Sequence, residues 1–208
     1  MRAHTMAFYS DVILPRLCDL AMRNKQLVPY RERVIGRAEG RVLEIGAGSG
    51  RNLPFYGPSA KQILALEPSP KLVAMARGLP HQEIPVTFLE ASAEAIPLDD
   101  RTVDTVVTTW TLCTIPQAAT ALGEMRRVLR PGGRLLFVEH GLSPDERVRW
   151  WQDRLTPAWK SISGGCHLNR PIQALIEGAG YRIERIETGY MPGLKPMTFM
   201  YEGSARPG

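Results

Sequence analysis

Short apolar runs alternate with amphipathic stretches along most of this chain, and this alternation limits its fold more than any other feature of the sequence. Near-continuous apolar runs are typical of parallel strands that are buried on both faces. Amphipathic stretches suit the helices that connect such strands. We therefore expect an α/β fold with a mostly parallel, doubly wound sheet and helices on both faces. The expected parallel strands cover residues 41–45, 62–66, 86–90, 103–109 and 134–139.

Cap and breaker residues predict where several helices begin and end. Ser69 followed by Pro70 predicts an N-cap with proline at the first helical position. Pro116 predicts the start of a helix that ends near Arg130. Ser143, with a glutamate three positions later, has the spacing of a capping box and predicts a further helix start.

The two ends of the chain carry weaker patterns. Helical spacing of apolar residues predicts helices over residues 6–22 and 29–38, before the first strand. Residues 181–186 and 196–201 are predicted to form an antiparallel hairpin at one edge, which brings the sheet to seven strands. We expect the last residues, 203–208, to form a loose tail.

Composition is consistent with one globular domain in a reducing compartment. The chain has 208 residues, of which 44% are hydrophobic and 23% are charged. Cys18, Cys113 and Cys166 are an odd number of cysteines at spacings that suit neither a disulfide framework nor a zinc pair. Charged residues interrupt the first twenty positions, so we expect no signal peptide and a cytoplasmic location.

The net charge of +5 raises the question of an acidic partner. Basic residues are frequent near the N-terminus, but no aromatic side chains alternate with them and no nucleic-acid motif accompanies them. We therefore interpret them as the solvated face of a helix and expect no nucleic-acid partner.

The first predicted strand runs directly into a glycine-rich turn, Gly46 to Gly50. In a doubly wound sheet this first turn is the usual place for a ligand. A dinucleotide is disfavoured because its fingerprint requires a third glycine where this chain has Arg51. Glu44 would also face a pyrophosphate across a partly desolvated loop. A ligand with an ammonium and a sulfonium group is favoured instead.

Glu67 ends the second predicted strand. A carboxylate at this position can accept hydrogen bonds from both ribose hydroxyls of a bound nucleotide. This applies to NAD and to an adenosyl ligand alike, so Glu67 predicts an adenosine without choosing between them. A solvated carboxylate at a strand end is the alternative.

Four motifs follow one another along the chain, at residues 42–50, 66–69, 91–97 and 130–133. In this combination the chain resembles the class I S-adenosylmethionine-dependent methyltransferases. The resemblance implies a Rossmann-like fold with S-adenosyl-L-methionine as cofactor and S-adenosyl-L-homocysteine as its product. It further implies one domain over residues 1–208, made of an N-terminal helical lid (1–38), a cofactor-binding core (39–142), and an acceptor-side segment with the edge hairpin (143–203).

The same resemblance assigns parts of the cofactor to parts of the chain. Glu44 and the glycine turn lie along the methionine part, Glu67 holds the ribose, and residues 92–94 lie beside the adenine. Many relatives carry Asp where this chain has Ser92, so adenine recognition is expected to depend more on backbone groups. The predicted cofactor-binding residues are Glu44, Gly46, Ala47, Gly48, Gly50, Asn52, Glu67, Pro68, Ser92, Ala93, Glu94, Thr109 and Thr111.

The predicted catalytic residues are Trp110, Cys113 and His140, at the ends of the fourth and fifth strands. His140 can take a proton from an attacking thiol, hydroxyl or amine because its pKa lies near neutrality, and a structural role in anchoring a loop is the alternative. Trp110 either covers the cofactor or acceptor, or packs in the core. The fourth strand lacks the Asn/Asp-Pro-Pro-Tyr run of nucleobase methyltransferases, which disfavours a DNA substrate.

A later segment contains Trp150, Trp151 and Trp159 close together. These side chains suit an apolar acceptor pocket, a peripheral membrane contact or ordinary helix packing. Cys166 and His167 are adjacent, but two adjacent residues without further ligands make a poor metal site, so we expect none.

This C-terminal segment, together with residues 112–113, 138–140, 157–159 and 165–166, is similar to animal methyltransferase-like proteins that methylate alkyl thiols, and to bacterial UbiE-type enzymes that act on quinones or phospholipids. The preferred acceptor is a small thiol. Phospholipid amines, quinones and a noncatalytic protein that only binds S-adenosylmethionine remain alternatives. We expect no counterpart of the animal proteins' N-terminal membrane anchor, and the oligomeric state stays open.

Overall fold

The computed structural model describes residues 9, 13–79 and 84–208 of the chain. Part of the predicted first helix, residues 6–8 and 10–12, lies outside the described residues. The elements are α2 (Leu14–Met22), η2 (Lys25–Leu27), α3 (Val28–Ile35), β1 (Gly40–Ile45), η3 (Leu53–Phe55), β2 (Ala60–Leu66), α4 (Pro70–Arg77), β3 (Val86–Leu89), β4 (Val103–Thr109), α5 (Ala118–Val128), β5 (Leu129–His140), α6 (Glu146–Ile162), α7 (Ile172–Gly178), β6 (Tyr181–Tyr190), α8 (Lys195–Thr198) and β7 (Phe199–Pro207).

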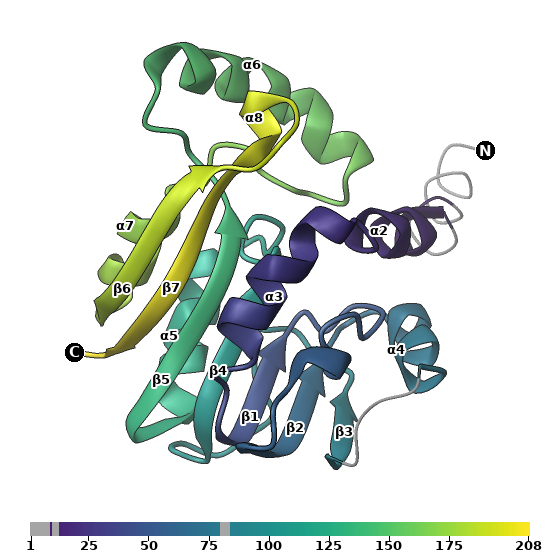
Figure 1. Cartoon of the computed structure of the whole chain (residues 1–208), viewed down its shortest axis with the longest axis vertical. Coiled ribbons are helices and arrows are strands. Elements are labelled where there is room, and N and C mark those ends of the chain that lie inside the picture. The colour runs from purple at the N-terminus through teal and green to yellow at the C-terminus, as the bar shows by residue number, and fades with distance from the viewer. Residues whose placement is uncertain (1–8, 10–12, 80–83) are drawn as a thin grey trace.

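These strands form one seven-stranded sheet in the order β3-β2-β1-β4-β5-β7-β6 (Figure 1). Neighbours from β3 to β5 pair in parallel, whereas β7 is antiparallel to both β5 and β6. The predicted parallel sheet with an antiparallel edge hairpin is confirmed. The strand order reverses between β1 and β4, and such a switch point is where open α/β sheets bind their ligands.

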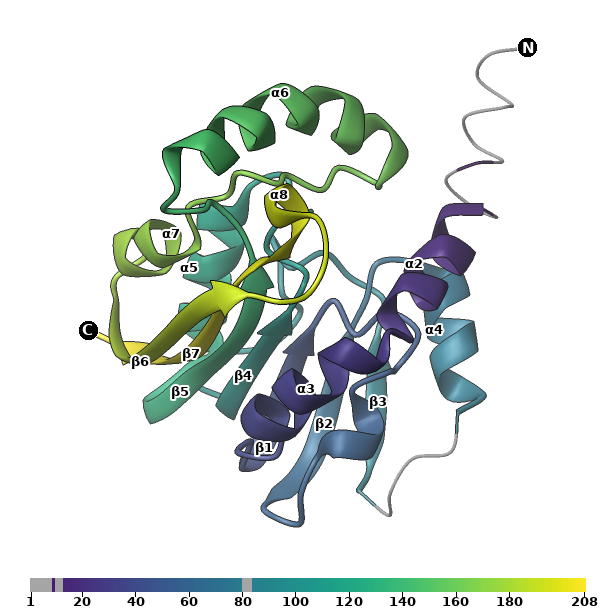
Figure 2. The ribbon, with the colours of Figure 1, turned by 45° about the horizontal axis from the view of Figure 1, so that its top comes forward.

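Side chains of each strand alternate between two apolar layers. Leu43 packs in one layer with Met125 of α5 and Ile176 of α7. Its neighbour Val42 packs in the other layer with Ile35 of α3. Figure 2 shows α3 on one face of the sheet, with α5 and α7 on the opposite face. The polar residues that follow the strands are thereby held at the edge where the parallel strands end.

The prediction of a loose C-terminal tail is wrong. Residues 203–207 belong to β7, where Gly203 lies opposite both Phe137 of β5 and Ile186 of β6. A Cβ atom at Gly203 would lie 2.1 Å from the carbonyl oxygen of Arg185 and 2.8 Å from the Phe137 ring. The small residues of this segment therefore allow close strand packing. The predicted strand over 196–201 also began too early, because Lys195–Thr198 forms the short helix α8.

Helix starts agree with the sequence prediction in part. Ser69 caps α4, and its hydroxyl accepts a hydrogen bond from the Leu72 N–H at 3.4 Å. The cap of α6, however, is Asp145, not Ser143, because the Asp145 carboxylate accepts from the Arg147 N–H at 2.9 Å. Ser143 instead contacts the Tyr190 hydroxyl at 2.6 Å.

The two ends of α5 also differ from the prediction. The helix begins at Ala118, two residues after Pro116, and ends at Val128. β5 then starts at Leu129, whereas the prediction placed its first residue at 134. The Pro-Gly-Gly segment is thus the irregular beginning of the strand, where the pairing with β4 shifts register.

None of the helices within the described residues combines the length and the apolar composition that a bilayer crossing requires.

Candidate active site

The glycine turn after β1 leaves its backbone open to a ligand at one position, Gly48. Gly46, Gly48 and Gly50 have φ values of 65°, 56° and 79°, a region that disfavours other residues. A Cβ atom at Gly46 would lie 2.4 Å from Thr111, and one at Gly50 would lie 3.0 Å from Ala76. At Gly48 the nearest atom would be 3.9 Å away. Gly46 and Gly50 therefore serve packing, while Gly48 leaves the backbone accessible from the outside.

Glu67 connects the end of β2 to this turn. Its carboxylate accepts hydrogen bonds from the Gly48 N–H at 3.0 Å and from the Ser69 N–H at 2.9 Å. Burial raises the pKa of Glu67, and these two bonds partly offset that effect. A buried carboxylate beside an open glycine backbone suits the hydroxyl groups of a ribose.

Glu44 lies beneath the turn and is bound by protein groups. Its carboxylate accepts from the Asn52 side-chain amide at 2.8 Å and from the Tyr56 hydroxyl at 2.9 Å. The Asn52 amide also donates to the Thr109 hydroxyl at 2.8 Å, and Arg31 donates to the Asn52 oxygen at 2.9 Å. Burial raises the pKa of Glu44 to about 7. The sequence predicted Glu44, Asn52 and Thr109 as cofactor residues but missed the roles of Arg31 and Tyr56.

The segment predicted to lie beside the adenine forms a turn after β3. Ala93 is buried in the core, while Ser92 is exposed and its hydroxyl donates to Glu94 at 2.9 Å. The other Glu94 oxygen accepts from the Gln117 N–H, at the cap of α5, at 2.7 Å. Ser92 is thus exposed and Glu94 partly exposed, and both lie between β3 and β4 in the chain. Pro68, which follows Glu67, directly precedes the cap of α4.

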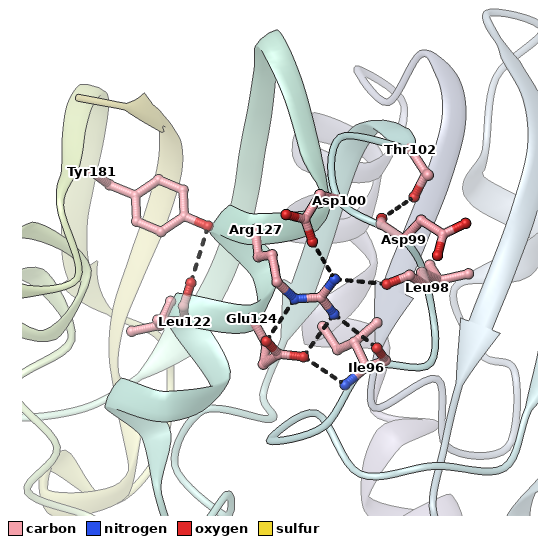
Figure 3. Close-up of polar contacts among 9 residues, drawn as sticks. All are labelled: Ile96, Leu98, Asp99, Asp100, Thr102, Leu122, Glu124, Arg127 and Tyr181. Atoms are coloured by element: carbon pink, nitrogen blue, oxygen red, sulfur yellow. Dashed lines mark hydrogen bonds and ion pairs between the residues drawn. The ribbon is translucent and has the colours of Figure 1, made fainter.

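Arg127 of α5 holds the chain that follows this turn, at residues 96–100 (Figure 3). Its guanidinium donates to the carbonyl oxygens of Leu98 and Ile96 at 2.7 and 2.9 Å. It also binds the carboxylates of Glu124 and Asp100 at 2.7 and 2.8 Å. These bonds raise the pKa of Arg127, so the group stays charged and fixes this segment relative to α5.

Trp110 follows β4 in an unusual backbone conformation. Its φ is 51°, which a bulky residue rarely adopts and which is common at functional sites. The Arg31 guanidinium lies 5.2 Å from the ring centre, and Tyr30 meets the ring edge-to-face at 6.5 Å. The ring is partly buried against the apolar layer of α3, so both predicted roles of Trp110 remain compatible with its place.

Glu139 fixes the loop that follows Trp110, and the sequence prediction missed it as a site residue. Its buried carboxylate accepts from the N–H groups of Thr111 and Leu112 at 2.9 and 3.2 Å, and from the Thr108 hydroxyl at 2.8 Å. Burial raises the pKa of Glu139 to about 7. Thr111 in turn lies against Gly46, so this carboxylate also supports the glycine turn.

The structure brings His140 and Cys113 together with Cys166. The His140 Nε2 lies 3.1 Å from the Cys166 Sγ, and one ligand-type atom from each of the three residues lies within 4.8 Å of the others. Burial opposes the charged form of His140, but Cys166 and Glu139 outweigh this effect and raise its pKa. The argument that Cys166 has no further ligand residues nearby is therefore wrong, because its neighbours come from other loops.

Comparisons with known proteins show which families and folds this chain is similar to. Residues 43–137 match the family model described as "Methyltransferase domain". The thiol S-methyltransferase TMT1B of Rattus norvegicus is 36% identical over 157 residues, which cover 72% of this chain and 63% of that protein. The human thiol S-methyltransferase TMT1A is 34% identical over 151 residues, covering 67% of this chain and 59% of that protein. Residues 43–137 therefore form a methyltransferase domain, and the chain is similar to these two methyltransferases. It spans less than two thirds of the length of these two relatives.

Solved structures show the same methyltransferase fold at low sequence identity. A SAM-dependent methyltransferase of Thermotoga maritima superposes with a TM-score of 0.68 at 21% identity and covers 97% of this chain and 98% of its own. A SAM-dependent methyltransferase of Leishmania major gives 0.70 at 17% identity, with 98% and 82% covered. These structures share the fold of this chain.

Proposed function

We propose that this methyltransferase transfers the methyl group of S-adenosylmethionine to a small-molecule thiol. The observation that carries the proposal is the 36% identity with a thiol S-methyltransferase over 72% of the chain. The open backbone at Gly48, next to the buried Glu67 carboxylate, suits the donor.

The donor binds along the edge where β1, β2 and β4 end. The ribose hydroxyls donate to Glu67, the methionine part lies over Gly46 and Gly48, and the adenine lies against the turn at Ser92. Glu44 acts through Asn52 and Tyr56, because it is only 1% exposed beneath the turn and binds both of these side chains. Asn52 then places the Thr109 hydroxyl, which lies at the end of β4.

The acceptor approaches from the side of His140 and Trp110. The thiol sulfur forms a bond to the methyl carbon, the bond from that carbon to the donor sulfonium breaks, and the thiol proton passes to His140 or to water. Alignment of the three atoms and exclusion of water provide most of the acceleration in such a displacement. Few side chains are needed for this reaction.

We also assign the N-terminal helices to a lid over the donor. Asp19 of α2 binds both Ser49 and Arg51 of the glycine turn, at 2.6 and 2.8 Å. The Tyr9 hydroxyl donates to the carbonyl oxygen of Ile162, at the end of α6. The lid therefore contacts the donor side and the acceptor side at once.

The first experiment is calorimetric titration with S-adenosylmethionine and S-adenosylhomocysteine. Glu67→Ala is expected to weaken donor binding about 10- to 100-fold, because hydrogen bonds to a charged group contribute roughly 1.5–3 kcal/mol. The matched control is Glu90→Ala, which removes an exposed carboxylate directly after β3 and should bind like the wild type.

A methyl-transfer screen in the same preparation identifies the acceptor class. The panel contains alkyl thiols, amines, phenols, quinols and phospholipids. Turnover of thiols alone supports the proposal, and turnover of phospholipids or quinols alone would replace it. Donor binding without any turnover would indicate a protein that only senses S-adenosylmethionine, and absence of donor binding would contradict the methyltransferase function itself.

A membrane-borne acceptor is the second candidate, and α6 favours it. Trp150 and Trp151 are 49% and 51% exposed, so ordinary helix packing does not explain them. The Arg154 guanidinium lies over the Trp150 ring at 3.9 Å, which places a cation beside exposed aromatic surface. Sedimentation with anionic phospholipid vesicles tests this candidate, and equal binding of Trp150→Ala/Trp151→Ala and the wild type would contradict it.

We propose that this protein is located in the cytoplasm. Cys18, Cys113 and Cys166 are all free in the structure, although Cys113 and Cys166 lie close together, and this suits a reducing compartment. Fractionation of cells that express the chain tests the location, and recovery in a secreted fraction would contradict it.

A further inference from the structure

Two thiols and an imidazole converge where the acceptor is expected. Cys113 comes from the loop after β4, His140 ends β5, and Cys166 lies in the loop after α6. Their sulfur and nitrogen atoms lie within 4.8 Å of one another, and the His140–Cys166 pair is separated by 3.1 Å. Three elements that are distant in sequence thus present their side chains to one point.

These distances are close to those of a tetrahedral metal site. Zinc binds sulfur at about 2.3 Å and imidazole nitrogen at about 2.0–2.1 Å, so tetrahedral ligands are separated by roughly 3.5–3.8 Å. The His140–Cys166 separation of 3.1 Å is somewhat shorter than this range, and all three ligand atoms lie within 4.8 Å of one another. Thiolate and imidazole ligands favour zinc over calcium or magnesium, which prefer oxygen ligands.

The surroundings hold the two cysteine loops together. The N–H of His167 donates to the Cys113 carbonyl oxygen at 2.9 Å, and the His167 ring nitrogen lies 3.1 Å from the same oxygen. Arg170 donates to the Ile115 carbonyl oxygen at 2.8 Å and contacts the His167 ring at 3.1 Å. These contacts fix the loop that carries Cys166 relative to the loop that carries Cys113.

The cluster offers three protein ligands that differ in burial. Cys113 is only 2% exposed, whereas His140 and Cys166 are half-buried. Three protein ligands are the pattern of catalytic zinc sites, which keep their fourth position for water or substrate. Structural zinc sites instead use four protein ligands.

We infer that Cys113, His140 and Cys166 hold a zinc ion whose fourth position binds the acceptor thiol. This inference rests on the proposed thiol methylation. On binding zinc, the thiol releases its proton to solvent and becomes a thiolate. The thiolate sulfur then bonds to the methyl carbon as the bond from that carbon to the donor sulfonium breaks. The product thioether is neutral, binds zinc weakly and dissociates, which leaves the ion and its three ligands unchanged.

The test measures metal binding by the full chain. After removal of bound metal with a chelator, the protein is titrated with Zn²⁺ and, separately, with Co²⁺, whose absorption reports thiolate ligands. We expect about one ion per chain, and at least tenfold weaker binding in Cys113→Ser and in Cys166→Ser. The matched control is Cys18→Ser, which removes the cysteine outside the cluster and should bind metal like the wild type.

A second measurement tests whether a thiol binds the metal at its fourth coordination position. Addition of 2-mercaptoethanol to the Co²⁺ form should change its absorption, because a new thiolate ligand enters. Titration with S-adenosylhomocysteine shows whether each variant is folded. If the wild type binds no more zinc than the Cys113→Ser/Cys166→Ser double variant, or if the thiol leaves the Co²⁺ spectrum unchanged, the inference is overturned.

Methyl transfer separates this inference from the proposed function. If metal-free protein methylates thiols as fast as the zinc form, the metal inference fails and the thiol methyltransferase stands. If zinc binds at these residues but no thiol is methylated in either form, the proposed function fails and only the ion-binding part of the inference survives. A rate that falls with metal removal and returns with Zn²⁺ supports both.

Discussion

At the scale of single residues, two buried carboxyls control how stability depends on pH. Burial raises the pKa of Glu44 and of Glu139 to about 7, whereas a glutamate in an unfolded chain titrates near about 4.3. Between these values the folded protein holds protons that the unfolded chain has lost. The free energy of unfolding should therefore fall as pH rises from about 5 to about 8, by at most about 3 kcal/mol per carboxyl.

Urea unfolding of the ligand-free protein at several pH values measures this dependence. Glu44→Gln removes one of these titrations, so the decline across the same window should become smaller. Glu32→Gln, an exposed change on α3, should leave the slope as in the wild type. Stability that increases with pH throughout the window would contradict the assignment of two buried, protonated carboxyls.

Residue positions could be predicted from the sequence where a local motif carries them. The sequence placed Glu67 at the end of the second strand, and the structure shows it directly after β2, where its carboxylate accepts from the Gly48 N–H. The partners of Cys166 could not be predicted, because His140 is 26 residues away and the two meet only when α6 folds back. Likewise, no local pattern shows that Glu44 binds Tyr56 and not a ligand.

At the scale of elements, α2 is attached to the donor site through one side chain. Asp19 is 4% exposed and binds Ser49, Arg51 and Arg23 at 2.6–3.0 Å. Burial opposes its ionisation, but the bonds from Arg51, Ser49 and Arg23 lower the pKa of Asp19 to about 2. This arrangement makes the position of α2 depend on a single carboxylate.

Asp19→Asn should loosen α2 while the sheet stays intact. We expect donor binding to weaken about tenfold and trypsin cleavage after Arg23 to accelerate, because the amide loses the ion pairs with both arginines. Calorimetry and timed proteolysis measure the two effects. Unchanged proteolysis and unchanged donor affinity would show that α2 does not act as a lid.

The bounds of a strand could be predicted from the sequence where the pattern of apolar residues is strong. The parallel strands β1 to β4 begin and end within about two residues of their predicted bounds, because each is an apolar run between polar turns. β7 was misplaced because its sequence is rich in small and charged residues, which resemble a loop. Its stability as a strand comes from two neighbouring strands, and sequence spacing does not reveal them.

At the scale of the whole molecule, the C-terminal strand joins the edge of the sheet to its centre. β7 lies between β5 and β6, and the sheet order gives β6 no other neighbour. Deletion of residues 203–208 would remove the pairing of Leu135 with Ala205 and of Phe137 with Gly203. It would also expose apolar residues such as Tyr181 and Ile183, which pack against the core from β6.

This deletion should therefore abolish cooperative folding, although it removes only the end of the chain. Loss of several buried pairs costs more than about 4 kcal/mol, a large part of the 5–15 kcal/mol that is typical of a whole domain. Removal of Gly208 alone leaves β7 complete and is the matched control, with an expected change in the free energy of unfolding below about 1 kcal/mol. Thermal unfolding followed by circular dichroism compares the two. A chain shortened after Glu202 that still unfolds cooperatively near the wild-type temperature and binds S-adenosylhomocysteine would show that the sheet does not depend on β7.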